Sequence, residues 1–104
     1  MPWVYLVIAG VLEVVWASAM KQSMGFTRLI PSIITLVTMG ISFALLALAM
    51  RSLPLGTAYT VWTGIGAVGA FIVGVVMLGE SVNPMRLAAA GLVIAGVVLF
   101  RLAE

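Results

Sequence analysis

The charged residues of this 104-residue chain are so widely spaced that they leave long stretches without any charge. Residues 29–50 and 52–79 carry none, and each run exceeds the roughly 20 residues that a helix needs to cross the hydrocarbon layer of a bilayer. A chain this short that is 64% hydrophobic and 8% charged has too little interior to bury its apolar surface in water. The sequence therefore predicts an integral membrane protein.

We expect an all-α membrane protein in which four transmembrane helices form one domain over residues 1–104. Their ranges are about 3–20, 29–50, 57–79 and 84–103. Helices are the only option, because four spans cannot close a β-barrel. A cleaved signal peptide is disfavoured at the N-terminus, since no basic residue precedes the first apolar run and a glutamate interrupts it.

The last helix has only a short uncharged stretch, so its ends need separate support. Asn83 is a good N-cap and Pro84 a good first helical residue, while Arg86 and Arg101 can extend to the two membrane interfaces. Thr27 is the corresponding candidate cap for the second helix.

Composition excludes several kinds of chemistry. The chain has neither cysteine nor histidine, so we expect no disulfide, no metal site and no cofactor. We find no nucleophile–base pair, which argues against an enzyme. The net charge of +2 is ordinary for a membrane protein and gives no case for nucleic acid as a partner.

A single glutamate, Glu13, lies in the middle of the apolar run "VIAGVLEVVWASAM" (7–20). Residues three and four apart share a helix face, so small side chains at Gly10 and Ala17 leave space beside it and Trp16 supplies a flat wall. A carboxyl group buried without a partner holds its proton more tightly than one in water, and it binds a cation once ionised. The alternative is a purely structural polar contact, but no basic residue lies at the same depth. We therefore predict a proton-coupled cation site.

The third span carries the second cluster, in "GTAYTVWTGIGAVG" (56–69). Tyr59 and Trp62 share a face, although a tyrosine near a helix end is also typical of an interfacial anchor. Gly64 and Gly66 lower helix stability, so they either let the helix bend as a conformational hinge or let another helix approach closely. Both interpretations stay open.

The other two spans offer fewer polar groups. In the second, Ser42 shares a face with Thr38 and either bonds its own backbone or donates to the Glu13 carboxylate. In the fourth, Gly91 and Ala95 form a small-xxx-small pair, which is typical of a surface on which another helix packs. We expect this surface to mediate dimer packing.

The basic residues do not set a clear orientation in the membrane. The side with both termini carries Arg51 and Arg101, and the other side carries Lys21, Arg28 and Arg86. Lysine and arginine normally mark the cytoplasmic side. So small a difference leaves open a weakly biased single orientation and a dual topology.

Four stretches carry a resemblance to a known family: "LEVVWA" (12–17), "GFTRLIPS" (25–32), "LPLGTAYTVWTGIGAVG" (53–69) and "GESVNPMRL" (79–87). Over essentially its full length the chain resembles the small multidrug resistance transporters. The resemblance implies a proton-coupled exporter of small cations in the bacterial inner membrane, working as a dimer that is commonly antiparallel. It also implies that Glu13 is the carboxylate shared by protons and substrate.

Within that family, the chain is similar to the guanidinium-exporter subtype. Trp16 stands where exporters of polyaromatic cations usually have a small residue, and Ser42 stands where those have a tyrosine. The resemblance implies that substrate is surrounded by five residues: Gly10, Trp16, Ser42, Tyr59 and Trp62. The rival functions are a broad exporter of quaternary ammonium or hydrophobic cations, a passive channel, and a non-transporting subunit or heterodimer partner.

Overall fold

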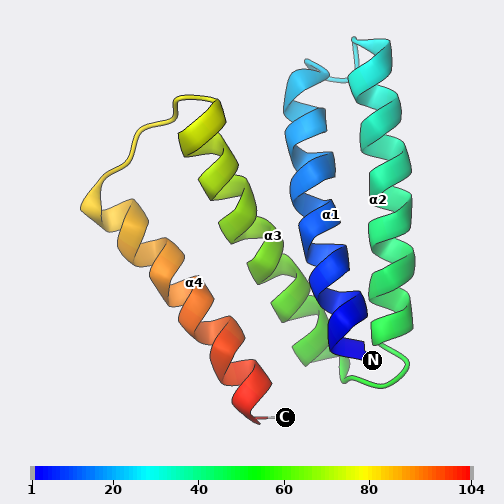
Figure 1. Cartoon of the computed structure of the whole chain (residues 1–104), viewed down its shortest axis with the longest axis vertical. Coiled ribbons are helices and arrows are strands. Elements are labelled where there is room, and N and C mark those ends of the chain that lie inside the picture. Colours follow the sequence, from blue (N-terminus) through cyan, green and yellow to red (C-terminus); the bar gives the residue numbers. More distant parts are fainter. Residues whose placement is uncertain (1, 104) are drawn as a thin grey trace.

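Four α-helices make up the part of the chain that the computed structural model describes, residues 2–103 (Figure 1). They are α1 (Pro2–Gln22), α2 (Leu29–Ala49), α3 (Leu55–Met77) and α4 (Pro84–Ala103), and no strand occurs in this range. All four are long and apolar enough to cross a membrane. The prediction of an all-α protein with four spans is confirmed, and the observed bounds lie within two residues of the expected ones.

Every proline of the chain lies at the start of a helix. Pro2 and Pro84 are the first residues of α1 and α4, Pro31 lies in the first turn of α2, and Pro54 immediately precedes α3. The amides of a first helical turn have no intrahelical acceptor, so a residue without an N–H is tolerated there. The prolines therefore separate the spans and interrupt none of them.

The two predicted helix caps differ in outcome. The Arg86 amide donates a hydrogen bond to Asn83 Oδ1 at 2.8 Å, which confirms Asn83 as the cap of α4. The prediction for Thr27 is wrong: its hydroxyl donates to the carbonyls of Ser23 and Met24, at 3.1 and 2.9 Å, and α2 begins without a side-chain cap bond. The N-cap position of α2 is Arg28, so Thr27 lies one residue before it and bonds the carbonyls of the preceding turn instead.

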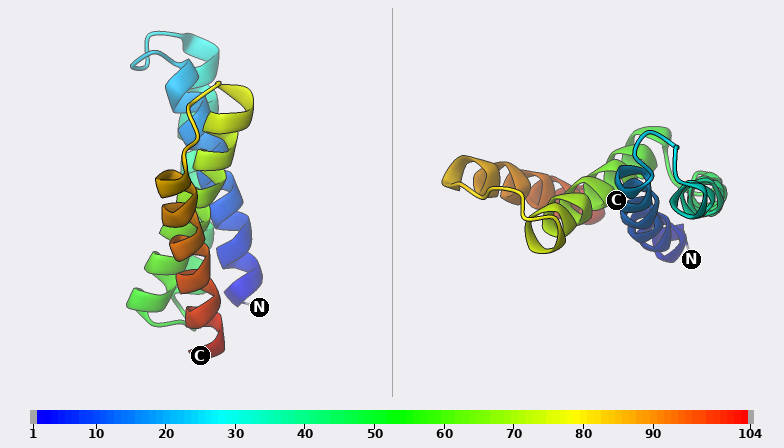
Figure 2. Two further views of the ribbon diagram at one scale, coloured as in Figure 1. Left: turned by 90° about the vertical axis from the view of Figure 1, so that its left-hand side faces the viewer. Right: turned by 90° about the horizontal axis from the view of Figure 1, so that it is seen from above.

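The helices lie side by side in the order α2, α1, α3, α4 and form a slab with extents of 40 × 34 × 16 Å (Figures 1 and 2). The core is the contact region of the first three helices, and its buried members are Leu6, Ala9, Leu46, Ala49, Leu53, Ala58, Val61 and Trp62. The backbone of α4 approaches only α3, and no described residue of α4 is buried. Most large apolar side chains face outward, as expected where lipid rather than water is the solvent.

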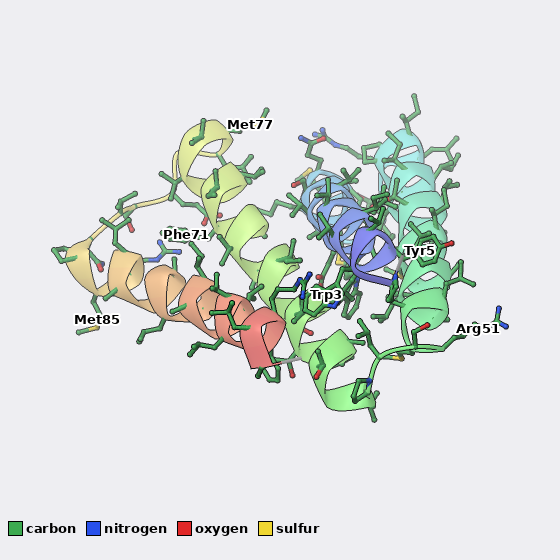
Figure 3. All side chains as sticks on the ribbon, turned by 60° about the horizontal axis from the view of Figure 1, so that its bottom comes forward. Trp3, Tyr5, Arg51, Phe71, Met77 and Met85 are labelled. Atoms are coloured by element: carbon green, nitrogen blue, oxygen red, sulfur yellow. The ribbon has the colours of Figure 1, made fainter. Side chains whose placement is uncertain are left out.

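Two cation–π contacts hold the ends of α4. Arg101 lies over the ring of Trp3 on α1, and Arg86 lies over the ring of Phe71 on α3, each at 5.2 Å from the ring centroid. In Figure 3, Phe71 is labelled above the N-terminal half of α4 and Trp3 near its C-terminal end. Both arginines thus contact aromatic rings at opposite ends of the span, where charged groups can still reach the interface.

Candidate functional site

Glu13 lies within one residue of the middle of α1, and its side chain contacts the middle of α3. The contact is with Gly66, where an added Cβ would collide with the carboxyl group of Glu13. Only a glycine at this position lets the carboxyl group lie directly on the backbone of α3. The middle of α3 is therefore one wall of the site.

One oxygen of the Glu13 carboxyl group has no hydrogen-bond partner among residues 2–103. Its Oε1 atom is buried and accepts no hydrogen bond from any residue in the range 2–103. The ion pair that the structure shows within that range does not involve Glu13. It joins Glu80, in the loop before α4, to Arg86, in the first turn of α4, at 3.8 Å. A polar atom in the hydrocarbon layer costs free energy unless it is satisfied, so this oxygen is suited to receive a proton or a cation from outside the chain.

Aromatic rings from three helices form a row that begins one turn from Glu13 along α1 and includes Trp62, about one turn before Gly66 on α3. Phe43 on α2 lies between two tryptophans, with ring centroids 6.3 Å from Trp16 on α1 and 5.7 Å from Trp62 on α3, both in edge-to-face geometry. Tyr59 continues the row at 5.6 Å from Trp62. Trp62 is only 6% exposed whereas Tyr59 is 52% exposed, so the row runs from the helix contacts to the open surface.

Phe43 was not identified from the sequence. Adjacent residues of a helix point about 100° apart, so periodicity did not group Phe43 with its neighbour Ser42. Both belong to the site because each of them contacts residues of both α1 and α3. An aromatic residue within one position of a mid-span polar group was the only signal available.

Ser42 links the three core helices by hydrogen bonds. Its hydroxyl donates to the Ala9 carbonyl of α1 at 2.7 Å and accepts from the Trp62 indole N–H of α3 at 3.0 Å. The sequence left two options for this hydroxyl, its own backbone or the Glu13 carboxylate, and the structure shows a third. Its neighbour Thr38 does bond its own helix, donating to the Ile34 carbonyl at 2.6 Å.

The indole of Trp16 adds a second unpaired polar atom. Its Nε1 atom is buried and donates to no acceptor among the described residues, and it lies one turn after Glu13 on α1. A donor and an acceptor without partners therefore occur on one helix face. Two such buried groups in a native structure call for an explanation, and a bound ligand is a common one.

The remaining predicted residues lie at helix contacts or on the surface. The space at Gly10 is filled by Ile65 of α3, whose Cγ2 lies 2.5 Å from where a Cβ would be, and Gly64 receives Val97 of α4 in the same way at 2.7 Å. α3 continues as a helix through Gly64 and Gly66, so both act here as sites of close approach, and a hinge role stays a prediction. Gly91 has no other atom within 4 Å of its added Cβ.

Ser42→Ala is expected to lower the free energy of unfolding by about 1–2 kcal/mol. The substitution removes both hydrogen bonds and leaves the Trp62 N–H buried without an acceptor. Thr38→Val is the matched control, because its hydroxyl bonds only its own helix, and a change below about 0.5 kcal/mol is expected there. Unfolding in mixed micelles, followed by circular dichroism, gives both values. Equal stability of the two variants would show that the Ser42 bonds do not hold the helices together.

Comparison with known proteins gives a consistent result over the whole chain. Residues 1–100 match the Small Multidrug Resistance protein family. The chain is 62% identical over 102 residues to the guanidinium exporter of Escherichia coli K12, covering 98% of this chain and 97% of that protein. It is 59% identical, with the same coverage, to the guanidinium exporters of Citrobacter freundii and Salmonella typhimurium. Four spans and enterobacterial exporters as relatives make this a multi-pass protein of the bacterial inner membrane. The chain belongs to the small multidrug resistance family.

Proposed function

We propose that this protein exports guanidinium and small guanidinyl cations in exchange for protons, by alternating access. The observation that carries the proposal is the unpaired Glu13 oxygen at mid-membrane beside a row of aromatic rings. The names of the relatives support guanidinium as the cargo. Residues 1–104 act in this proposal as one transmembrane domain.

The chemistry of the site suits a planar cation. Guanidinium stays charged at any biological pH and presents its N–H donors in one plane, so a carboxylate can accept two of them in a fork. Aromatic faces attract the flat side of the same ion. Glu13 is thus the acceptor, and Trp16, Tyr59 and Trp62 are the walls, with Phe43 between the tryptophans.

Coupling follows from competition for one carboxylate. A protonated Glu13 has no charge for guanidinium, and a guanidinium-bound Glu13 has no free oxygen for a proton. Protons entering from outside therefore displace the cation there, and the cation reloads in the cytoplasm as protons leave. The proton gradient then drives export without a second ion site.

A single slab of four helices cannot enclose such a site from both sides, and we infer an antiparallel homodimer. Larger transporters place the site between two inverted halves, and a second, inverted copy can supply the missing half. The outer face of α4 supports this arrangement, because Gly91 and Ala95 are exposed on it and, among the described residues, the backbone of α4 approaches only that of α3. A heterodimer with a related chain is the alternative.

Gly91→Leu is expected to weaken the dimer roughly 5- to 150-fold, equivalent to about 1–3 kcal/mol of over-packing. A Cβ atom added at position 91 meets nothing within 4 Å in its own chain, so we expect the fold of the protomer to be unchanged. Gly40→Leu on α2 is the control, since its Cβ position is equally open. Dimer fractions at graded protein-to-lipid ratios measure the effect. Unchanged dimerisation of the Gly91 variant would place the interface elsewhere.

The decisive assay uses vesicles containing the protein and a pH-sensitive dye, without an initial pH gradient. When guanidinium is more concentrated inside the vesicles, its efflux is expected to draw protons inward in exchange. Guanidinium efflux without proton influx would indicate a passive channel, and no guanidinium flux at all would indicate a non-transporting subunit. Tetrapropylammonium is the comparison cation, and proton movement driven as strongly by it as by guanidinium would favour the broad quaternary-ammonium exporter.

A further inference from the structure

The loop between α1 and α2 exposes two large hydrophobic side chains. Met24 is 62% exposed and Phe26 is 49% exposed, with Gly25 between them. Leu29 and Ile30 extend the exposed apolar surface into the first turn of α2. Four large apolar side chains exposed within seven residues of the chain indicate a surface that contacts something apolar.

The backbone of this loop is left-handed at three consecutive residues. The φ angles are 50° at Met24, 75° at Gly25 and 67° at Phe26. Glycine adopts this conformation freely, but side chains with a Cβ are destabilised in it, and it is rare for a bulky residue such as phenylalanine. Glycine or asparagine would be less strained at both outer positions. Large apolar side chains held there against the backbone preference point to a role for the side chains themselves.

Ser23 holds the loop in this shape. Its side chain is fully buried, its hydroxyl donates to the Met20 carbonyl at 2.6 Å, and it accepts the Phe26 amide at 3.0 Å. Its carbonyl accepts the amides of Thr27 and Arg28, at 2.8 and 3.1 Å. These bonds satisfy several polar groups of the turn internally, while its large hydrophobic side chains are exposed.

The position and charge of the loop match a lipid surface. The loop joins two spans directly, which places it at the boundary of the hydrocarbon layer, and it projects sideways from the helix pair instead of continuing along it (Figure 2, left). Lys21 and Arg28 flank it, and both are exposed. Neither pairs with an acidic side chain of residues 2–103. Basic residues at this depth are attracted to anionic phospholipids.

We propose that the loop of residues 23–28 docks on the bilayer, with Met24 and Phe26 inserted beneath the headgroups and Lys21 and Arg28 on the phosphates of anionic phospholipids. The loop is then an anchor that fixes the depth and tilt of the α1–α2 pair, and with it the depth of the carboxyl-bearing helix. This role does not depend on which cation the protein carries.

The absence of cysteine from the chain makes a direct test simple. The test variants are Met24→Cys and Phe26→Cys, each labelled with a nitroxide and placed in lipid vesicles. Two further labelled variants are the references: Leu36→Cys, which faces outward within the α2 span, and Ser81→Cys, which lies in an exposed loop. Power saturation with oxygen and with a water-soluble nickel complex reports immersion. We expect the labels at 24 and 26 to show an oxygen-to-nickel ratio severalfold above that of Ser81→Cys and close to that of Leu36→Cys.

Two outcomes overturn the proposal. Nickel accessibility at 24 and 26 equal to that at position 81 would mean that the loop lies in water. Shielding from both reagents, with spin–spin broadening between labels, would mean that a second copy of the chain covers the loop.

The charge part is tested with the label at position 26 in vesicles with and without phosphatidylglycerol. The anionic lipid is expected to favour the inserted loop by roughly fivefold for each basic residue. Lys21→Gln with Arg28→Gln should remove this gain while leaving immersion in phosphatidylcholine unchanged. If the double variant responds to phosphatidylglycerol as the parent does, the two basic residues do not hold the phosphates.

Discussion

Glu13→Gln is expected to abolish guanidinium-driven proton movement while leaving the protein folded. The amide has nearly the shape of the carboxyl group but neither binds nor releases a proton, so no exchange can be coupled through it. It also cannot form the two charge-assisted hydrogen bonds, worth about 1.5–3 kcal/mol each, that an ionised carboxylate offers a guanidinium ion. Guanidinium binding should therefore weaken by at least roughly 100-fold. Proton flux in vesicles and guanidinium binding by calorimetry measure the two effects.

Glu80→Gln is the matched control. Glu80 lies in the loop before α4, exposed and 3.8 Å from Arg86, so it shares the chemistry of Glu13 but not its depth. We expect this variant to keep coupled transport. If Glu13→Gln still moved guanidinium against its gradient, the exchange site would have to lie at another group.

Gly66→Ala is expected to reduce transport by about two orders of magnitude without unfolding the protein. The new methyl group would occupy the place of the Glu13 carboxyl, which is the far end of a flexible side chain and can move aside. Alanine is also the better helix former, so the free energy of unfolding should stay the same or rise by up to about 1 kcal/mol. A shift of about 1 Å in a group that must meet its ligand can cost roughly 100-fold.

Gly40→Ala separates this effect from a general gain in helix stiffness. Gly40 lies within one residue of the middle of α2, as Gly66 does in α3, but nothing lies within 4 Å of its Cβ position. We expect the two variants to unfold at similar temperatures, whereas only the variant at position 66 loses transport activity. Loss of activity in both would point to bending of the helices as the common requirement.

The spans could be predicted because membrane helices follow local rules. In the hydrocarbon layer each backbone amide must bond within its own helix, so an uncharged run of sufficient length is sufficient to predict a span. The prolines marked the same boundaries independently, and Asn83 capped α4 as expected. Thr27 failed because a local hydroxyl has several carbonyls within reach, and the turn decides which is closest.

The part of the site that lies on a single helix could also be predicted from local rules. Glu13 was conspicuous as the one charge at mid-span, and Trp16 followed from its place one turn away on the same helix. The partners of Ser42 were not predictable, since the Ala9 carbonyl and the Trp62 indole belong to two other helices. Phe43 was missed because its contacts likewise cross between helices.

Two features follow from distances along the chain alone: the four membrane crossings and the single carboxyl group at the centre of the first crossing. Three others become visible only when the helices are packed together: α1 lies between α2 and α3, Gly66 receives the carboxyl group, and Ser42 joins three helices. They are not encoded locally because lipid accepts every apolar face of a helix about equally well. The order and rotation of the helices are therefore selected by close packing and by a few buried polar contacts, which no single helix reveals.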